Sequence, residues 1–143
     1  KKEDLDVPHD WLKVIEKTNG NWKKIILYNT GVAALLTYNE QWVDKIENVL
    51  KTFEENREKI ALWWRPHPLT ESTIKSMRPE VLQKYMLLKE QYIEEGWGIY
   101  DETADVDRAV VISDAYYGDG SSVAQLYKKT GKPVMIQNME INI

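Results

Sequence analysis

An arginine and a histidine stand beside two prolines in the run Arg65-Pro66-His67-Pro68, directly after a short apolar segment. A guanidinium can hold a phosphate through two parallel hydrogen bonds, and an imidazole can donate a further one. Because proline fixes its own backbone and donates no hydrogen bond, the run predicts a rigid loop. Two interpretations follow: Arg65 and His67 bind phosphate, or Arg65 pairs with a surface carboxylate and His67 only fills the loop.

A second candidate site is the run Gly118-Asp119-Gly120-Ser121-Ser122. Glycines let a ligand approach the backbone closely, and hydroxyls with unpaired N–H groups at a helix start suit phosphate. The run is no dinucleotide fingerprint, because the third glycine is missing, and no Gly-Lys-Ser/Thr completes a P-loop. The alternative is ordinary capping, in which Gly120 and Ser121 merely turn the chain.

Single residues near other predicted strand ends extend the candidate set. Asp101 and Asp114 could accept hydrogen bonds from ribose or polyol hydroxyls, bind a hard cation, or cap helices. Thr30 follows the first predicted strand, and Tyr116 and Tyr117 fall in the expected ligand loop. With only two histidines in the chain, no His-based zinc site is expected. We expect neither a metal nor a cofactor.

Five apolar runs bounded by turn residues predict the strands that position these groups. The fourth, at residues 109–112, is typical of a strand buried on both faces, and it is expected to end in Ser113 and Asp114 after a helical turn at residues 102–108. The other four strands are expected at residues 24–28, 60–64, 98–100 and 134–137. Helical spacing or capping predicts helices after Pro8, over 39–53 and 70–77, from Pro79 to Gly96, and after Ser121.

Strands that alternate with helices at this spacing predict an α/β fold with a parallel sheet and right-handed crossovers. We expect a Rossmann-like three-layer sandwich with strand order 3-2-1-4-5. In that order the carboxyl ends of the first and fourth strands lie side by side at the switch point, where such folds bind ligands. Residues 1–22 are expected to form a linker and a short helix, and residues 23–143 the Rossmann-like domain.

Composition excludes several classes of protein. The 143 residues, 43% hydrophobic and 29% charged, suit one globular domain. A net charge of −4 disfavours nucleic acid as a partner. The absence of cysteine and of any long apolar run predicts a cytoplasmic protein without disulfides or a membrane span. Because the chain begins with Lys1, we expect it to be a piece of a longer protein.

The two motifs together resemble the carboxyl-terminal half of the CDP-glycerol glycerophosphotransferase family, over about residues 24–138. The resemblance rests on the Arg-Pro-His-Pro run after a strand, on Ile112-Ser113-Asp114, and on Ser121-Ser122-Val123 opening a helix. Family members commonly run from the Ser-Asp pair almost directly into the Ser pair, whereas residues 115–120 intervene here.

The resemblance implies one half of a two-domain GT-B enzyme, the half that binds a CDP-linked donor. In the family, the histidine of the first motif and the serine pair contact the donor phosphates. By resemblance these roles fall to His67, Ser121 and Ser122, with Arg65 and Asp114 in support.

The function implied is transfer of glycerol phosphate from CDP-glycerol, or of a related polyol phosphate, during synthesis of teichoic-acid-type polymers in bacteria. An acceptor hydroxyl attacks the donor's β-phosphorus and CMP leaves, while this domain stabilises the charge on the phosphates. The catalytic base would lie in a missing amino-terminal, acceptor-binding half, so the chain alone is expected to bind and not to turn over. The full-length protein is expected at the inner face of the membrane.

Two alternatives stay open at this point. The chain could be half of a GT-B glycosyltransferase or of a sugar-nucleotide epimerase, which would use the same kind of phosphate site. It could instead be a non-catalytic module that recognises a phosphorylated ligand or a protein partner.

Overall fold

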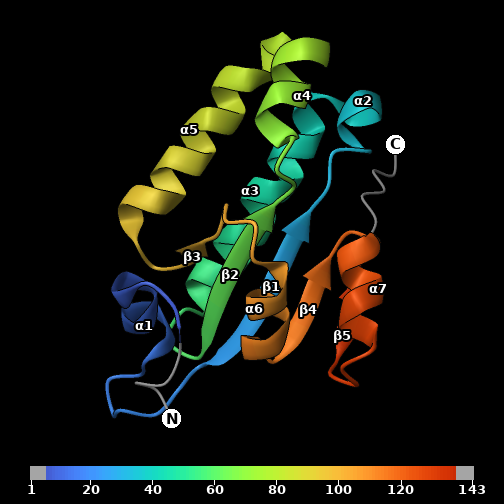
Figure 1. The fold of residues 1–143 in the computed structure, drawn as a ribbon. Helices are drawn as coiled ribbons and strands as arrows, with labels where there is room; N and C mark the ends of the chain where they lie inside the picture. The colour runs from blue at the N-terminus through green and yellow to red at the C-terminus, as the bar shows by residue number, and fades with distance from the viewer. Residues whose placement is uncertain (1–5, 138–143) are drawn as a thin grey trace.

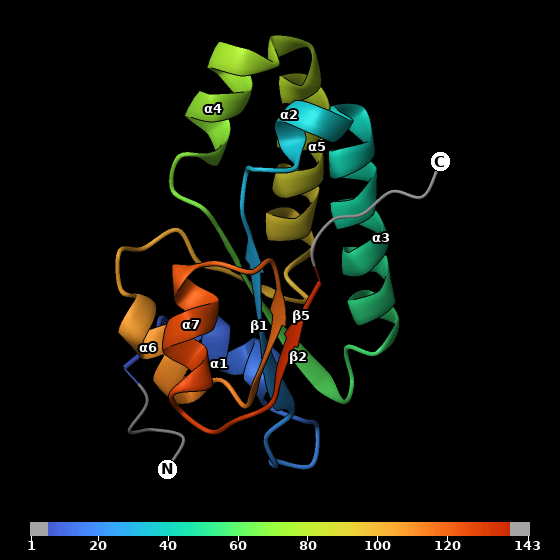
Figure 2. The ribbon, with the colours of Figure 1, turned by 90° about the vertical axis from the view of Figure 1, so that its right-hand side faces the viewer.

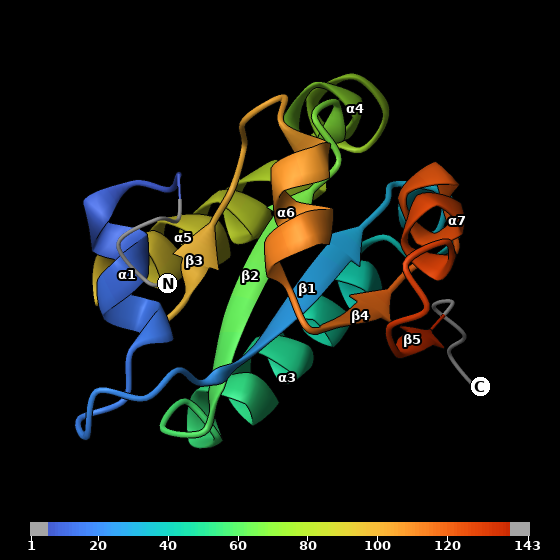
Figure 3. The ribbon, with the colours of Figure 1, turned by 60° about the horizontal axis from the view of Figure 1, so that its bottom comes forward.

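The computed structural model describes residues 6–137. Residues 1–5 of the predicted linker and residues 138–143 of the predicted domain lie outside this range. Five parallel strands form one sheet in the order β3-β2-β1-β4-β5 (Figure 3). The predicted fold class and strand order are therefore confirmed. The strands are β1 (Lys24–Thr30), β2 (Ile60–Pro66), β3 (Ile99–Tyr100), β4 (Ala115–Gly118) and β5 (Val134–Ile136).

Helices cover both faces of this sheet, as Figure 2 shows from the side. One face carries α3 (Glu40–Glu55) and α5 (Pro79–Glu95), with the short α2 (Leu35–Tyr38) and α4 (Thr70–Met77) beyond the strand ends. The other face carries α1 (His9–Ile15), α6 (Val106–Ile112) and α7 (Ser122–Lys128). The result is the expected three-layer sandwich.

Alternation along β2 builds the two apolar layers between helices and sheet. Leu62 and Trp64 pack toward α3 and α5, whereas Ala61 and Trp63 pack toward α1 and α6. Both tryptophans are fully buried. Burying two such large side chains stabilises the central strands by several kcal/mol, about 1.5–3 for each.

The fourth strand was predicted in the wrong place. The apolar run at residues 109–112 is the end of helix α6, which begins at residue 106 where the Asp105 carboxylate accepts a hydrogen bond from the Arg108 N–H (3.0 Å). Val111 is 75% exposed, so the run is not buried on both faces. A short apolar run is compatible with a strand or with a helix. Here the Asp105 cap favours the helix.

The true fourth strand is formed by residues 115–118, which were expected to be a ligand loop. Tyr116 pairs with Leu27, and Tyr117 with Tyr28, in parallel register with β1. Aromatic residues favour strands because they pack well on a pleated sheet. Gly118 is consequently the last residue of β4 and not a loop glycine.

Strand β2 is longer than predicted and includes the first two residues of the Arg-Pro-His-Pro run. Pro66 pairs with Thr30 of β1, although proline usually ends a strand. Pairing with β3 stops at Trp64 and Tyr100, so Pro66 has no further strand on its other side. A missing N–H costs nothing at such an edge position.

Gly118 lies against the Asn29 backbone near the end of β1, in a conformation that other residues rarely adopt. Its φ is +144°, and a Cβ at this position would stand 2.2 Å from the carbonyl oxygen of Asn29. We expect Gly118→Ala to lower the free energy of unfolding by about 2 kcal/mol or more, measured by urea denaturation.

Gly31→Ala is the matched control for this substitution. Gly31 lies on the neighbouring strand end without a left-handed φ, and its nearest contact would be 3.4 Å away. Equal losses from the two substitutions would contradict the argument from close backbone approach.

Candidate functional site

The candidate site lies at the carboxyl edge of the sheet, where β1, β2 and β4 end (Figure 1). Since β1 is the middle strand of these three, the ends of β2 and β4 lie on either side of it. Neighbouring strands are about 4.8 Å apart, which puts the two outer ends about 10 Å from each other. The loops after β2 and β4 therefore border one small region above the end of β1.

Main-chain hydrogen bonds tie both loops to the end of β1. The N–H of His67 donates to the carbonyl oxygen of Thr30 (2.9 Å), and the N–H of Asp119 donates to that of Asn29 (3.1 Å). In return, the Asp119 carboxylate accepts from the Gly31 N–H (2.7 Å). The histidine loop and the glycine-serine loop are thus held by the same three residues.

The Asn29 side chain fixes the start of α7. Its amide donates to the Tyr116 hydroxyl (3.2 Å) and to the Ser121 hydroxyl (3.1 Å). Ser121 also accepts from the Ala124 N–H (3.3 Å), so it caps the helix. Tyr116 is 1% exposed and donates to the carbonyl oxygen of Asp119. These contacts give Ser121 and Tyr116 positioning roles, and no ligand can stack on Tyr116.

His67 stands exposed at the end of β2. Its Nδ1 accepts a hydrogen bond from the Leu69 N–H (3.0 Å), so in the neutral ring the proton is on Nε2. That N–H can donate to an acceptor outside the protein. The loop thereby presents one oriented hydrogen-bond donor at the carboxyl edge.

Ser122 presents the matching group at the end of β4, after the glycine loop that ends in Gly120. Both residues are exposed, and Ser122 is the first residue of α7. Among residues 6–137, the Ser122 hydroxyl makes none of the side-chain hydrogen bonds that hold its neighbours. Of the serine pair, Ser121 serves the fold and Ser122 faces outward.

Arg65 and Asp101 form a buried ion pair. The Arg65 Nη1 lies 3.0 Å from the Asp101 Oδ2, with side chains 9% and 0% exposed. The Asp101 carboxylate also accepts from the Trp63 indole (3.0 Å) and from the N–H and hydroxyl of Thr103 (2.9 and 2.7 Å). Arg65 thus pairs with a carboxylate, though a buried one instead of the surface group of the second interpretation. Asp101 has its acceptors occupied by the protein.

Asp114 lies at the opposite edge of the sheet, because the strand it was expected to end is a helix. It precedes β4, where its carboxylate accepts from the Ile25 N–H (2.8 Å) and its own N–H donates to the carbonyl oxygen of Ile25 (2.7 Å). This pair aligns the starts of β1 and β4. The prediction that Asp114 ends a strand is wrong, and Asp119 is the carboxylate at the carboxyl end of β4.

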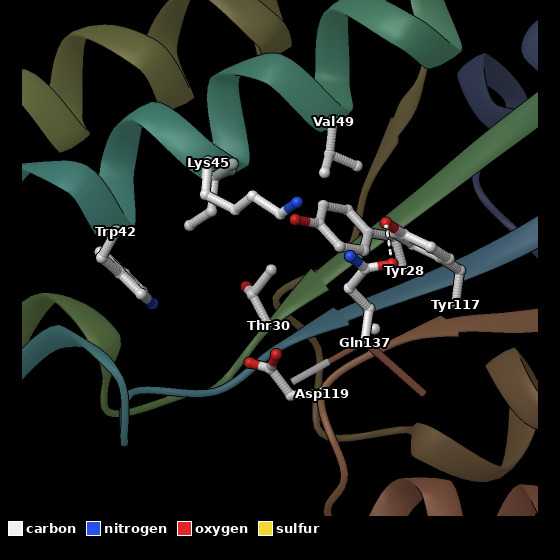
Figure 4. A pocket seen from close by; sticks show the side chains of 10 residues that line it. Tyr28, Thr30, Trp42, Lys45, Val49, Tyr117, Asp119 and Gln137 are labelled. Carbon is white, nitrogen blue, oxygen red and sulfur yellow. Dashed lines mark hydrogen bonds between the residues drawn. The ribbon is translucent and has the colours of Figure 1, made fainter. Parts of the chain in front are cut away.

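A small hollow between α3 and the ends of β1 and β4 adds residues that sequence reasoning missed (Figure 4). The ammonium group of Lys45 reaches over the hollow from α3, while Thr30 and Asp119 face it from the strand ends. Thr30 accepts from the Trp64 indole (3.1 Å), so its hydroxyl oxygen is engaged by the core. A signal for Lys45 exists in the sequence, because it shares helical spacing with the buried Trp42 and Val49.

Burial changes the pKa values of side chains that line this hollow. It raises the pKa of Asp119, and the hydrogen bond from Gly31 offsets part of that rise. Burial also raises the pKa of Tyr28 and of Tyr117, with the Asp119 charge as a further cause. Both phenols therefore stay protonated and can act as hydrogen-bond donors; that of Tyr117 donates to the Gln137 amide oxygen (3.0 Å).

Over residues 6–137, no cluster of three or more His, Asp or Glu side chains could hold a metal ion. Nor does any helix in that range have the length and apolar character needed to cross a bilayer. A scan against models of known protein families found no match to the chain, and a search of curated proteins found no relative.

The buried ion pair predicts a large stability loss on Asp101→Asn. The substitution leaves the Arg65 charge buried without a counter-charge, which costs about 3–5 kcal/mol. Urea denaturation measures this loss. The control Asp44→Asn removes a half-exposed ion pair with Lys84 and should cost about 1 kcal/mol or less. Similar losses from both would show that the buried pair is not structural.

Substitution of Asp119 should change how the free energy of unfolding depends on pH. Because burial raises the folded pKa of Asp119 above the ordinary 3.8, the folded state holds the proton more tightly than the unfolded state does. The Asp119 carboxyl group contributes most to stability below pH 3.8, the ordinary pKa. This contribution is lost as the pH rises through the pKa of the folded state. Asp119→Asn keeps an acceptor for the Gly31 N–H, so the variant should gain stability relative to the parent between acid and neutral pH.

The measurement is the free energy of unfolding of both proteins at several pH values from acid to neutral. Glu90→Gln, which alters an exposed carboxylate on α5, serves as the control and should show a constant difference from the parent. A constant difference for Asp119→Asn as well would mean that burial does not disfavour the Asp119 charge.

Proposed function

We propose that this chain is the donor-binding domain of a CDP-glycerol glycerophosphotransferase-type enzyme, and that the carboxyl edge holds the donor's diphosphate. The observation that carries the proposal is the pairing of two outward groups across β1. The His67 imidazole presents an oriented N–H at the end of β2, and Gly120 and Ser122 are exposed at the end of β4. Both loops are fixed to residues 29–31.

The spacing suits a ligand with two neighbouring phosphates. A diphosphate lying over the end of β1 would accept from the His67 N–H on one side. On the other side it would accept from the Ser122 hydroxyl. Gly120 lets the phosphate oxygens come close to the backbone. These donors act as a preorganised set for an anion.

The corrected position of β4 shortens the interval that separated the acidic residue from the serine pair, although Gly118 then stands where the family has the serine of its Ser-Asp pair. With Asp114 as the acidic residue of the motif, residues 115–120 intervene before the serine pair. With Asp119 in that role, the strand leads directly into Asp119-Gly120-Ser121-Ser122. The shift supports the resemblance and assigns Asp119, through its bond to Gly31, to positioning the loop.

The chemistry assigned to this domain is electrostatic. An acceptor hydroxyl would attack the β-phosphorus, the bond to CMP would break, and the proton would pass to a base on an amino-terminal half of the enzyme. His67 and Ser122 would stabilise the negative charge that grows on the phosphate oxygens, and removing one such donor typically costs 10²–10³-fold in rate. We place the full-length enzyme at the inner face of a bacterial membrane, where polymer acceptors lie.

The proposal predicts that Ser122→Ala and His67→Ala weaken binding of CDP-glycerol by about tenfold each, or about 1.4 kcal/mol. Neither side chain packs in the core, so the free energy of unfolding should change by about 0.5 kcal/mol or less. Calorimetric titration of the chain measures affinity, and amide chemical shifts identify the residues that respond. Shifts confined to regions outside the loops 67–69 and 118–122 would contradict the site.

Two serines serve as matched controls. Ser121→Ala removes a helix cap and should cost about 1 kcal/mol of stability, while Ser76→Ala, on the exposed side of α4, should change neither property. UDP-glucose, titrated in parallel, tests the glycosyltransferase and epimerase alternatives. Tighter binding of UDP-glucose than of CDP-glycerol would favour one of them over glycerophosphate transfer.

A further inference from the structure

A large hollow lies at the amino edge of the sheet, opposite the candidate site. Its volume is about 510 Å³, and Trp97 and Val14 form part of its wall. The charged residues that line it come from the end of α1 and the turn after it, from the start of β1, and from the loop between α3 and β2. They are Lys13, Glu16, Lys17, Lys23, Arg57, Glu58 and Lys59.

The charge of this lining opposes that of the whole chain. Five cations and two carboxylates give the hollow a formal charge of 5 − 2 = +3. The whole chain carries −4, so everything else sums to −4 − 3 = −7. Among residues 6–137, no ion pair joins Lys17, Lys23, Arg57 or Lys59 to a carboxylate. A positive hollow thus stands on an otherwise acidic protein.

Backbone hydrogen bonds hold the cationic segments in place. The Lys23 N–H donates to the carbonyl oxygen of Ile15 (2.8 Å), and the Lys24 N–H donates to that of Lys59 (3.1 Å). The turn between them closes through the Lys17 N–H, which donates to Asn21 (2.7 Å), and through Gly20, whose φ is +86°. The cations therefore converge because the sheet edge is ordered, and a ligand need not pay to assemble them.

Two further facts indicate that an anion would be favoured here. Burial lowers the pKa of Lys23, and the neighbouring Arg57 lowers it further against the opposing effect of Glu58, so a bound anion would relieve part of the cost of the Lys23 charge. A small-molecule site typically measures about 300–1,000 Å³, and this volume lies within that range.

We propose that this hollow binds a multiply charged phosphate group, such as a diphosphate, independently of the carboxyl-edge site. The ligand's oxygens would accept from Lys23 and Lys59 at the strand starts and from the Arg57 guanidinium, whose planar shape suits phosphate. The Arg57 Nη1 donates to the Glu54 carbonyl oxygen (2.9 Å), which leaves its other N–H groups for the ligand. The two sites lie about 20 Å apart, the length of a seven-residue strand. The phosphate group can belong to a free polyphosphate or to the headgroup of an anionic lipid.

The test is a titration of the chain with inorganic pyrophosphate, followed by amide chemical shifts. We expect saturable shifts in residues 13–24 and 57–59. The double variant Lys23→Gln/Lys59→Gln should weaken this binding by about tenfold, with thermal unfolding used to verify its fold. The control Lys128→Gln/Lys129→Gln removes the same charge from exposed positions at the end of α7 and should leave affinity within about twofold.

Vesicles separate the two sources of phosphate. Co-sedimentation with vesicles of equal parts phosphatidylcholine and phosphatidic acid, whose phosphomonoester can carry two charges, lost in the Lys23/Lys59 double variant, assigns the hollow to lipid headgroups. Saturable pyrophosphate binding without such co-sedimentation assigns it to a free phosphate. The proposal is overturned if neither probe binds or if both double variants behave alike. Pyrophosphate shifts only in residues 67–69 and 118–122 would overturn it too, while leaving the carboxyl-edge proposal standing.

Discussion

The end of the middle strand β1 is the constraint on which the site depends. Three consecutive residues, Asn29, Thr30 and Gly31, hold the loops from both neighbouring strands through backbone groups. Because β1 lies between β2 and β4, any change in its register would move both loops together. The carboxyl edge can therefore keep two outward donors at a fixed separation although each stands on a loop.

Burial separates the residues that position this site from those that can bind. A buried polar group must find a partner inside the protein. Asp101 and Asn29 have hydrogen-bond partners, and the Arg65 Nη1, which makes no hydrogen bond within residues 6–137, is held by its ion pair with Asp101. Their chemistry, which looks available in the sequence, is used within the fold. His67 and Ser122 are exposed at the same strand ends, so they are the groups that remain for a ligand.

The fold class and strand order could be predicted because apolar runs and turn residues alternate with a clear period. The position of β4 could not be predicted, because the four apolar residues at 109–112 are compatible with a strand and with a helix. The Asp105 cap decides in favour of the helix, but in the sequence it is one polar residue among many. Because of that single error, Asp114 was expected in the site and Tyr116 in a loop. Lys45 was missed for a different reason, because it lies on helix α3, which follows β1 in the sequence and meets the end of that strand only through tertiary packing.

The two sheet edges differ in chemistry for a reason that lies in the parallel topology. All five strands start at one edge of the sheet and end at the other. The connections that enter strands therefore lie at the amino edge, and those that leave strands lie at the carboxyl edge. At the carboxyl edge the buried Arg65 charge is already matched by Asp101, and recognition would depend on hydrogen-bond donors. At the amino edge, Lys17, Lys23, Arg57 and Lys59 form no ion pair within residues 6–137, and recognition would depend on net charge. An increase in salt should therefore weaken an anion bound at the amino edge more steeply than one bound at the carboxyl edge.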